Sequence, residues 1–233
     1  MRDLINRLFG RSPPSTSSRP MPASPAAQEP SGQSHAGEAD AIAELRDKIE
    51  RDVAGGFDDE DIILTTVADH FEGEMDPALV RRAAPEILRA ALAEHMRAQA
   101  GWPAVTDCDR LDAAFARLEA RGVIARQNFT CCMTCGSTEI WEEVQTAKEA
   151  GLPAYGYVFY HMQDTDSAVE GSGVYLAYGA CDEGEAPALD VAAQIVATLE
   201  AEGLAPEWDG SWDKRIAVPL DWKRRRGVAT YRS

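Results

Sequence analysis

"GVIARQNFTCCMTCGSTEIW", residues 122–141, joins two stretches of different periodicity. After Gly122, residues 123–129 have the β-branched and aromatic character of a strand, whereas residues 137–150 have helical spacing and are followed by Gly151. Three of the chain's five cysteines lie between them. The segment is therefore predicted to be the turn between a strand and the following helix, with thiols gathered in the turn.

The elements downstream of this turn predict the fold. Two aromatic, β-rich runs at 155–161 and 173–179 flank a polar loop, residues 185–203 form an amphipathic helix, and residues 204–210 and 215–222 have strand character. This β-α-β-β-α-β order is that of a ferredoxin-like domain. We expect an α+β protein with a ferredoxin-like βαββαβ antiparallel sheet over residues 121–222, two helices on one face and an extra C-terminal strand.

The residues upstream predict a helical subdomain over 38–120. Apolar side chains recur at helical spacing, and potential caps precede the helices at Asp58, Asp76 and Thr106 or Asp107. The last of these helices ends at Gly122, a typical C-cap residue.

Both ends of the chain are predicted to be tails. Residues 12–37 are rich in Pro, Ser and Ala without apolar periodicity, which predicts a disordered linker, so residues 1–37 are expected to be a tail with a short basic amphipathic start around Leu4 and Phe9. Residues 223–233 carry five basic side chains and are interpreted as a solubilising basic tail, with contact to RNA or an acidic surface as the alternative.

Charge limits the classes of partner. The chain has a net charge of −16, but both tails are net positive, so the body between them is more acidic still. Such a surface repels phosphate backbones, which disfavours nucleic acid, and attracts a basic protein partner. There is no membrane-length apolar run and no secretory signal, and an odd number of clustered cysteines favours a reducing compartment. We expect a cytoplasmic protein with no membrane span.

The cysteine cluster is the strongest candidate for chemistry. Cys132 and Cys135, followed by Gly136, have the spacing of half a zinc knuckle, but a structural zinc takes four ligands and no second half is adjacent in sequence. The predicted metal ligands, for zinc or another metal, are Cys131, Cys132, Cys135, His161 and Cys181. A turn with small buried thiols and a redox pair are the alternatives; in the redox case a helix starting near Ser137 makes Cys135 the activated thiol.

Two further features suggest binding. The polar loop after His161 contains Gln163, Asp164 and Glu170, which could act as base, orienter or metal ligands, or could simply cap a short helix. Trp208 and Trp212 flank an Asp-Gly turn, where they either close the core or anchor a partner.

Three motifs resemble a known bacterial family: "NFTCCMTCGSTEIW", "GYVFYHMQDTDSAVEGSGVYLAYG" and "EWDGSWDKRIAV". They are similar to members of domain of unknown function 6891, over residues 38–222, and this resemblance implies no activity. The order βαββαβ ending in "GLAPEWDGSWD" is more loosely similar to the acidic inhibitors of ribonuclease E. That second resemblance implies a protein-binding role and no site residue.

Two hypotheses follow. The first is a non-enzymatic binding or regulatory module that acts through its acidic surface and the Trp208 and Trp212 edge. The second is a metal-binding protein, either structural or enzymatic, built on Cys131, Cys132 and Cys135 together with His161 or Cys181.

Overall fold

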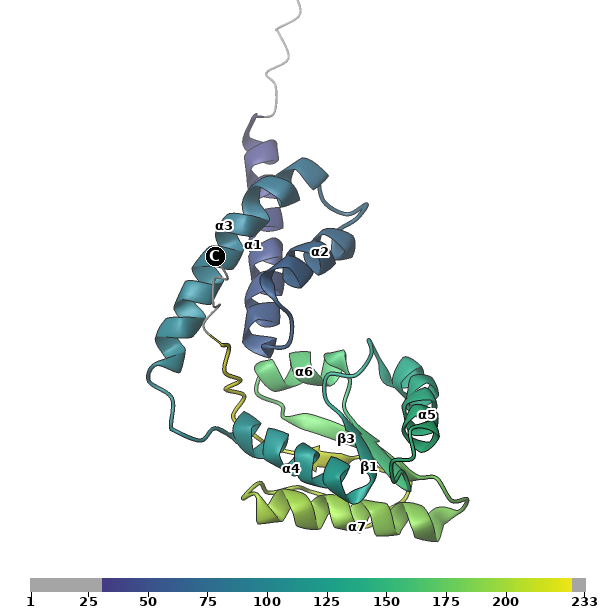
Figure 1. Ribbon diagram of the computed structural model, residues 1–233. Helices are drawn as coiled ribbons and strands as arrows, with labels where there is room; N and C mark the ends of the chain where they lie inside the picture. The colour runs from purple at the N-terminus through teal and green to yellow at the C-terminus, as the bar shows by residue number, and fades with distance from the viewer. Residues whose placement is uncertain (1–30, 228–233) are drawn as a thin grey trace, which may run out of the picture.

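The computed structural model describes residues 31–227, with side chains from residue 37 onward (Figure 1). The helices are α1 (Ser31–Gly55), α2 (Glu60–His70), α3 (Pro77–Gln99), α4 (Asp107–Arg121), α5 (Met133–Glu149), α6 (Met162–Val169) and α7 (Glu185–Ala201). The strands are β1 (Val123–Arg126), β2 (Gly156–Phe159), β3 (Val174–Ala180) and β4 (Ile216–Val218). Helix α1 begins inside the predicted linker, so residues 31–37 are helical. The amphipathic start and the rest of the linker lie outside the described residues.

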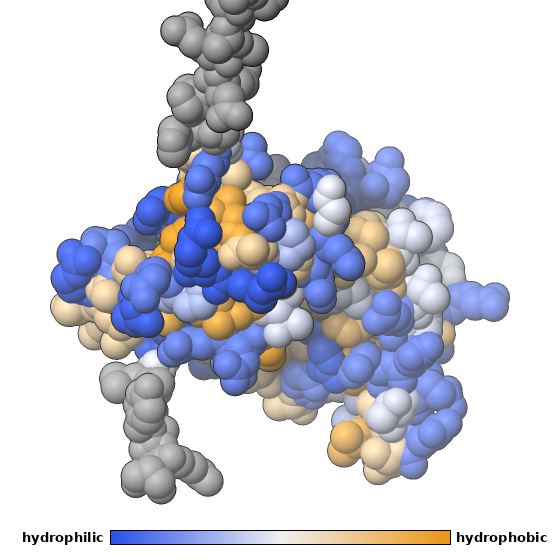
Figure 2. Space-filling model, turned by 90° about the horizontal axis from the view of Figure 1, so that it is seen from above, coloured by the Kyte–Doolittle hydropathy of each residue, from blue (hydrophilic) through white to orange (hydrophobic). Residues whose placement is uncertain are grey.

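Helices α1, α2 and α3 all pack against one another and form what we call the helical unit. Its core is separate from that of the sheet and contains Leu45, Ile49, Val53, Ile63, Val67, Phe71, Leu79, Ile87 and Leu88. Asp59, one residue after the predicted cap, accepts a hydrogen bond from the Ile62 amide, and Asp76 caps α3 as predicted. The view from above shows a largely hydrophilic surface with a patch of apolar side chains (Figure 2).

The remaining elements, α4 to β4, form what we call the sheet unit, and its topology corrects the ferredoxin-like prediction. The strand order is β1-β2-β3-β4, with β1 and β2 parallel and the other two pairs antiparallel. In a ferredoxin-like sheet another strand separates the two parallel strands, whereas here α5 returns the chain to pair β2 directly with β1. The sheet is therefore mixed, and residues 204–210 contribute only an isolated bridge from Glu207 to Ala217.

The helices cover both faces of the sheet, not one face as expected. Helices α4 and α7 pack with one face in a core that includes Phe115, Val158 and Ile195, whereas Ile140 and Val144 of α5 pack with Phe159 on the other face. The reason is strand alternation: successive residues of β1, Ile124 among them, point to opposite faces and both faces are apolar. Helix α4 thus packs with the sheet although it belongs to the predicted 38–120 segment.

The ends of α4 follow the sequence prediction. Thr106 and Asp109 form a reciprocal capping box, in which each side chain accepts a hydrogen bond from the backbone of the other residue. Gly122 ends the helix with φ of +94°, a conformation that glycine adopts without the strain other residues carry. The turn leads directly into β1, so α4 and β1 are positioned as one piece.

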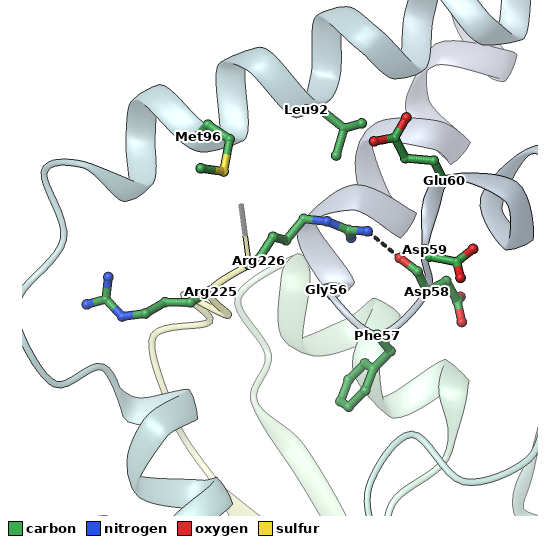
Figure 3. Close-up of a pocket in the computed structure, with 10 residues that line it drawn as sticks. Gly56, Phe57, Asp58, Asp59, Glu60, Leu92, Met96, Arg225 and Arg226 are labelled. Carbon is green, nitrogen blue, oxygen red and sulfur yellow. Dashed lines mark hydrogen bonds between the residues drawn. The ribbon is translucent and has the colours of Figure 1, made fainter. Parts of the chain in front are cut away.

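Residues 219–227, which we call the strap, connect the two units. The Trp222 indole donates to the Ala54 carbonyl (3.0 Å), the Arg224 guanidinium lies 4.0 Å from the centroid of the Phe57 ring, and Arg226 donates to the carbonyl oxygens of Val53 (3.0 Å) and Asp58. Figure 3 shows Arg226 reaching the α1–α2 turn, across a cavity of about 480 Å³ from Met96 of α3. Residues 223–227 are therefore packed between the units rather than being a solvated tail.

Among the described residues, no helix combines the length and the apolarity that a membrane span requires.

Candidate metal centre

The cysteines lie where β1 passes into α5. Helix α5 begins at Met133, ahead of the predicted start near Ser137, and Cys132 is its N-cap residue in extended conformation. Gly136, in the first turn of α5, is buried against the Phe159 ring, at a position where an added Cβ would overlap that ring. Close packing of α5 on the sheet therefore continues the helix through residues that sequence propensity assigns to a turn.

The loop before the helix has an unusual backbone. Asn128 and Thr130 have positive φ values of 50° and 59°. For β-branched Thr130 this conformation costs on the order of 1–2 kcal/mol, and such strain is found where surrounding contacts require it. Here the Thr130 carbonyl accepts a hydrogen bond from the Met162 amide (3.1 Å), and the Asn128 side chain accepts one from Thr165 (2.7 Å). The end of β2 and α6 thus fix the loop that carries Cys131.

Three thiols converge as a result. The sulfur atoms of Cys131, Cys132 and Cys135 all lie within 4.8 Å of one another, and those of Cys131 and Cys135 are 3.5 Å apart. A tetrahedral zinc ion with Zn–S bonds of about 2.3 Å holds its sulfurs roughly 3.8 Å apart, so the spacing suits one shared ion. Cys131 is exposed and the other two are half-buried. Within residues 37–227, this is the only group of three or more His, Cys, Asp or Glu side chains with such a spacing.

Cys132 and Cys135 differ in acidity. The pKa of Cys132 is lowered, chiefly by the backbone N–H of Cys135 and then by the neighbouring thiols. The pKa of Cys135 is raised to about 11 by its contacts with the Cys131 and Cys132 sulfurs, because ionising it would place a second negative charge beside them. The expectation that Cys135 is the activated thiol is therefore wrong: the N-cap position, and the lower pKa, belong to Cys132.

His161 precedes Met162, whose amide bonds to the Thr130 carbonyl of this loop, but it lies outside the thiol cluster. It is 5% exposed and caps α6: its Nδ1 accepts from the Asp164 amide (3.3 Å), and its Nε2 lies 3.2 Å from the Asp164 carboxylate. Arg215 Nη1 is 3.1 Å from both oxygens of that carboxylate. Both ring nitrogens thus face Asp164, and the three side chains form a capping network in which His161 and Asp164 are buried and the Arg215 side chain is partly exposed.

The network makes stability depend on pH. Burial lowers the pKa of His161 from its ordinary value of 6.5, with Arg215 acting in the same direction and Asp164 opposing. Just below pH 6.5 the unfolded chain binds a proton that the folded chain does not, so the free energy of unfolding falls as the pH falls, by at most about 1.4 kcal/mol per pH unit. We expect His161→Asn, which retains a capping side chain, to remove this component. Urea denaturation between pH 8 and 5 measures the free energy of unfolding of both proteins. If this free energy fell equally with pH in the wild type and the variant, His161 would not be the source of the pH dependence.

Cys181 is far from the cluster. It follows β3, where its amide donates to the Tyr155 carbonyl (2.8 Å), at the sheet end where β2 begins. The thiol cluster follows the opposite end, where Arg126 pairs with Phe159. Four strand residues at about 3.3 Å each separate the two ends by roughly 10 Å. Of the five predicted ligands, the structure brings together Cys131, Cys132 and Cys135 and leaves His161 and Cys181 apart.

Cys131 also borders a cleft of about 240 Å³ between the helical unit and α6. Gln163 and Asp166 of α6 line one wall, and Lys48 and Asp52 of α1 line the other. Burial raises the pKa of Asp52 even though Lys48 pairs with it at 2.5 Å. The sequence did not predict the α1 residues. Their only local signal is the i,i+4 spacing of Lys48 and Asp52, and the strap and α6 set their position opposite the cysteines.

The other predicted binding residues are dispersed. Glu170 pairs across the cleft with Arg51 (3.2 Å), so it helps to join α6 to α1. Trp208 is half-buried against the sheet core, with its indole donating to the Ser211 carbonyl (3.1 Å). Trp212 is 56% exposed beside a cavity of about 200 Å³. The two tryptophans therefore have different surroundings, one in the core and one at the surface.

The comparisons with known proteins agree with the first resemblance. No curated protein and no solved structure matches the chain, which leaves the similarity to ribonuclease E inhibitors without support. The family described as Domain of unknown function (DUF6891) matches residues 38–226, which include the helical unit, the thiol cluster and most of the strap. The chain therefore belongs to this family.

Proposed function

We propose that the protein binds a thiophilic metal ion, zinc in the first place, through Cys131, Cys132 and Cys135. The observation that carries the proposal is the convergence of three sulfur atoms within 4.8 Å at the surface of the sheet unit. Thiolates favour zinc and monovalent copper over hard cations such as magnesium. The lowered pKa of Cys132 supports the same conclusion, because a metal ligand must be a thiolate.

A ligand from outside the cluster would fill the fourth coordination position of the ion. Within the described residues the cluster has three members, and Cys131 lies on the wall of the cleft. A zinc ion with three protein ligands keeps a position for water or an exogenous ligand, unlike the closed four-ligand sites that only stabilise a fold. The proposed role is thus a metal site accessible to solvent, in a protein whose free thiols suit a reducing compartment such as the cytoplasm.

Metal titration tests this proposal. Protein stripped with a chelator under reducing conditions is titrated with zinc against a chromophoric chelator, and one equivalent is expected to bind. Cobalt substitution should give sulfur-to-metal charge-transfer absorption. A Cys181→Ser variant is the matched control and should bind equally. Less than about a tenth of an equivalent bound to the wild-type chain, at zinc concentrations that fill ordinary thiolate sites, would overturn the proposal.

A second candidate function, binding of a basic protein segment, is favoured by the uncovered half of the sheet. Helix α5 covers β1 and β2, whereas Tyr175 of β3 is 42% exposed and Trp212 is 56% exposed. Trp212 lines the cavity of about 200 Å³ together with Asp213, Lys214 and Arg215, and the Arg215 guanidinium lies 5.2 Å from the centroid of the Tyr175 ring. Lys214 pairs with Asp209 and Arg215 with Asp164. The exposed Trp212 ring beside Asp213, on a chain of net charge −16, therefore suits an arginine-containing peptide.

A short arginine-rich peptide is the probe for this second function. We expect saturable binding by calorimetry that weakens with salt. Trp212→Ala should lower the affinity about 30-fold, the effect of losing an aromatic anchor worth about 2 kcal/mol. Leu152→Ala, at an exposed apolar side chain that does not line this cavity, should leave the affinity unchanged. Equal binding by both variants would argue against this surface.

A further inference from the structure

We propose that the thiol cluster is redox-regulated: a mild oxidant such as hydrogen peroxide joins Cys131 and Cys135 in a disulfide and thereby releases the bound metal. The disulfide half of this inference stands on the geometry of the cysteines alone, whereas the release half rests on the proposed metal site.

The distance between the two sulfurs carries the inference. Cys131 Sγ and Cys135 Sγ are 3.5 Å apart, and a disulfide bond is about 2.05 Å long, so the sulfurs must approach by only about 1.5 Å. Cys135 lies on the first turn of α5, whereas Cys131 lies in the loop before the helix. Rotation of the Cys131 and Cys135 side chains, on a loop and a helix turn that are already adjacent, can supply a movement of this size.

Exposure and a neighbouring thiol together distinguish the cluster from Cys108 and Cys181. Cys131 is exposed, so an oxidant reaches it from solvent, and Cys135 is half-buried directly beside it. Cys108 of α4 is 1% exposed, and Cys181 lies at the opposite end of the sheet. Thiol oxidation depends on thiolate character, on exposure and on a resolving thiol nearby, and among the described cysteines the exposed Cys131 with Cys135 beside it supplies the last two.

The reaction balances with peroxide as the oxidant. The Cys131 thiolate attacks one peroxide oxygen, the O–O bond breaks, and water leaves after proton uptake, giving a sulfenic acid on Cys131. The Cys135 thiolate then attacks that sulfur and displaces hydroxide, which takes up the proton that Cys135 lost. Two thiols and one peroxide become one disulfide and two waters, and a dithiol reductant reverses the change.

Loss of the metal follows from the ligand count. The disulfide removes the thiolates of two of the three protein ligands and leaves Cys132 as the remaining one. A single thiolate without its chelating partners cannot hold the ion, so oxidation changes the affinity by far more than the roughly 100-fold effect of losing an outer-shell contact. The cluster would thus bind metal in reducing conditions and release it on oxidation.

Mass spectrometry of the metal-free chain tests the disulfide first. After treatment with stoichiometric peroxide, the peptide containing the cluster should lose two hydrogen atoms, with fragmentation assigning the bond to Cys131 and Cys135, and should regain them with a dithiol. Cys132→Ser keeps the pair and should still form the bond. Cys131→Ser and Cys135→Ser should not form it. Oxidation to sulfinic acids without a disulfide, or a bond between Cys132 and Cys135, would overturn the proposal.

The zinc-loaded chain tests the release with a chromophoric chelator in the same reaction. We expect one equivalent of zinc to appear with the disulfide and to rebind after reduction. Disulfide formation in a chain that never bound zinc would refute the proposed function and leave the thiol switch standing. Zinc binding that persists alongside a complete disulfide would refute the release and leave the metal site standing.

Discussion

Replacing Cys132 with serine is expected to lower the zinc affinity of the chain by at least about 100-fold. Cys132 is the N-cap residue of α5 and the thiol whose pKa is lowered, so it is the ligand most readily available as a thiolate. A serine hydroxyl stays protonated near neutral pH and offers the ion no anionic ligand. Loss of an outer-shell contact alone costs about 10- to 100-fold in metal affinity, and removing a direct ligand exceeds that. Competition titration against a chelator of known affinity measures the change.

The control for this experiment is Cys181→Ser, which removes a half-buried thiol outside the cluster. Serine is also a favoured N-cap residue, so Cys132→Ser should keep α5 intact, and circular dichroism should show unchanged helix content. Zinc affinity that is the same in the two variants would place the metal elsewhere and reject the three-cysteine site.

Replacing Tyr160 with alanine is expected to destabilise the fold by about 3–5 kcal/mol, the usual cost of deleting a buried aromatic ring. Tyr160 is fully buried directly after β2, its ring packs edge-on against Phe115 (5.8 Å between centroids) and Trp222 (6.4 Å), and its hydroxyl donates to Gln127 (2.9 Å). The ring therefore connects the sheet core, the strap and the loop that leads to the cysteines. Urea denaturation measures the loss.

The matched variant Tyr160→Phe separates packing from hydrogen bonding. It retains the ring and deletes only the hydroxyl, so we expect a cost of about 1 kcal/mol. If Tyr160→Ala lowered the free energy of unfolding no more than Tyr160→Phe does, packing of the ring would not stabilise the fold. The strap would then be held chiefly by its polar contacts.

Much of the local structure could be predicted because its causes are local. The capping box of Thr106 and Asp109 and the positive φ of Gly122 arise from residues a few positions apart, so the sequence contains the whole explanation. The predicted start of α5 failed for the opposite reason. Gly136 discourages a helix locally, but its contact with Phe159 requires glycine there and lets α5 begin at Met133.

The topology could not be read from the order of elements. A β-α-β-β-α-β string fits both a split sheet, in which another strand enters between the parallel pair, and the observed sheet, in which β2 lies directly beside β1. The choice depends on which faces are buried together. Both faces of β1 and β2 are apolar, and this favours helices on both sides.

The candidate site also has one part that follows from the sequence and another part that depends on the tertiary structure. The sequence by itself indicated the thiol cluster, because Cys131, Cys132 and Cys135 lie within five residues that are predicted to form a turn. It also determined the ends of α4, whose caps are local. Only the tertiary structure decided that Cys132 is the N-cap, that the His161 ring contacts Asp164 and that Cys181 lies at the far end of the sheet. The start of α5 at Cys132 depends on the contact of Gly136 with Phe159, and the place of Cys181 depends on strand pairing, so both rest on residues distant in sequence. The His161–Asp164 pair spans only three positions, but its burial beside Arg215 again depends on a residue distant in sequence.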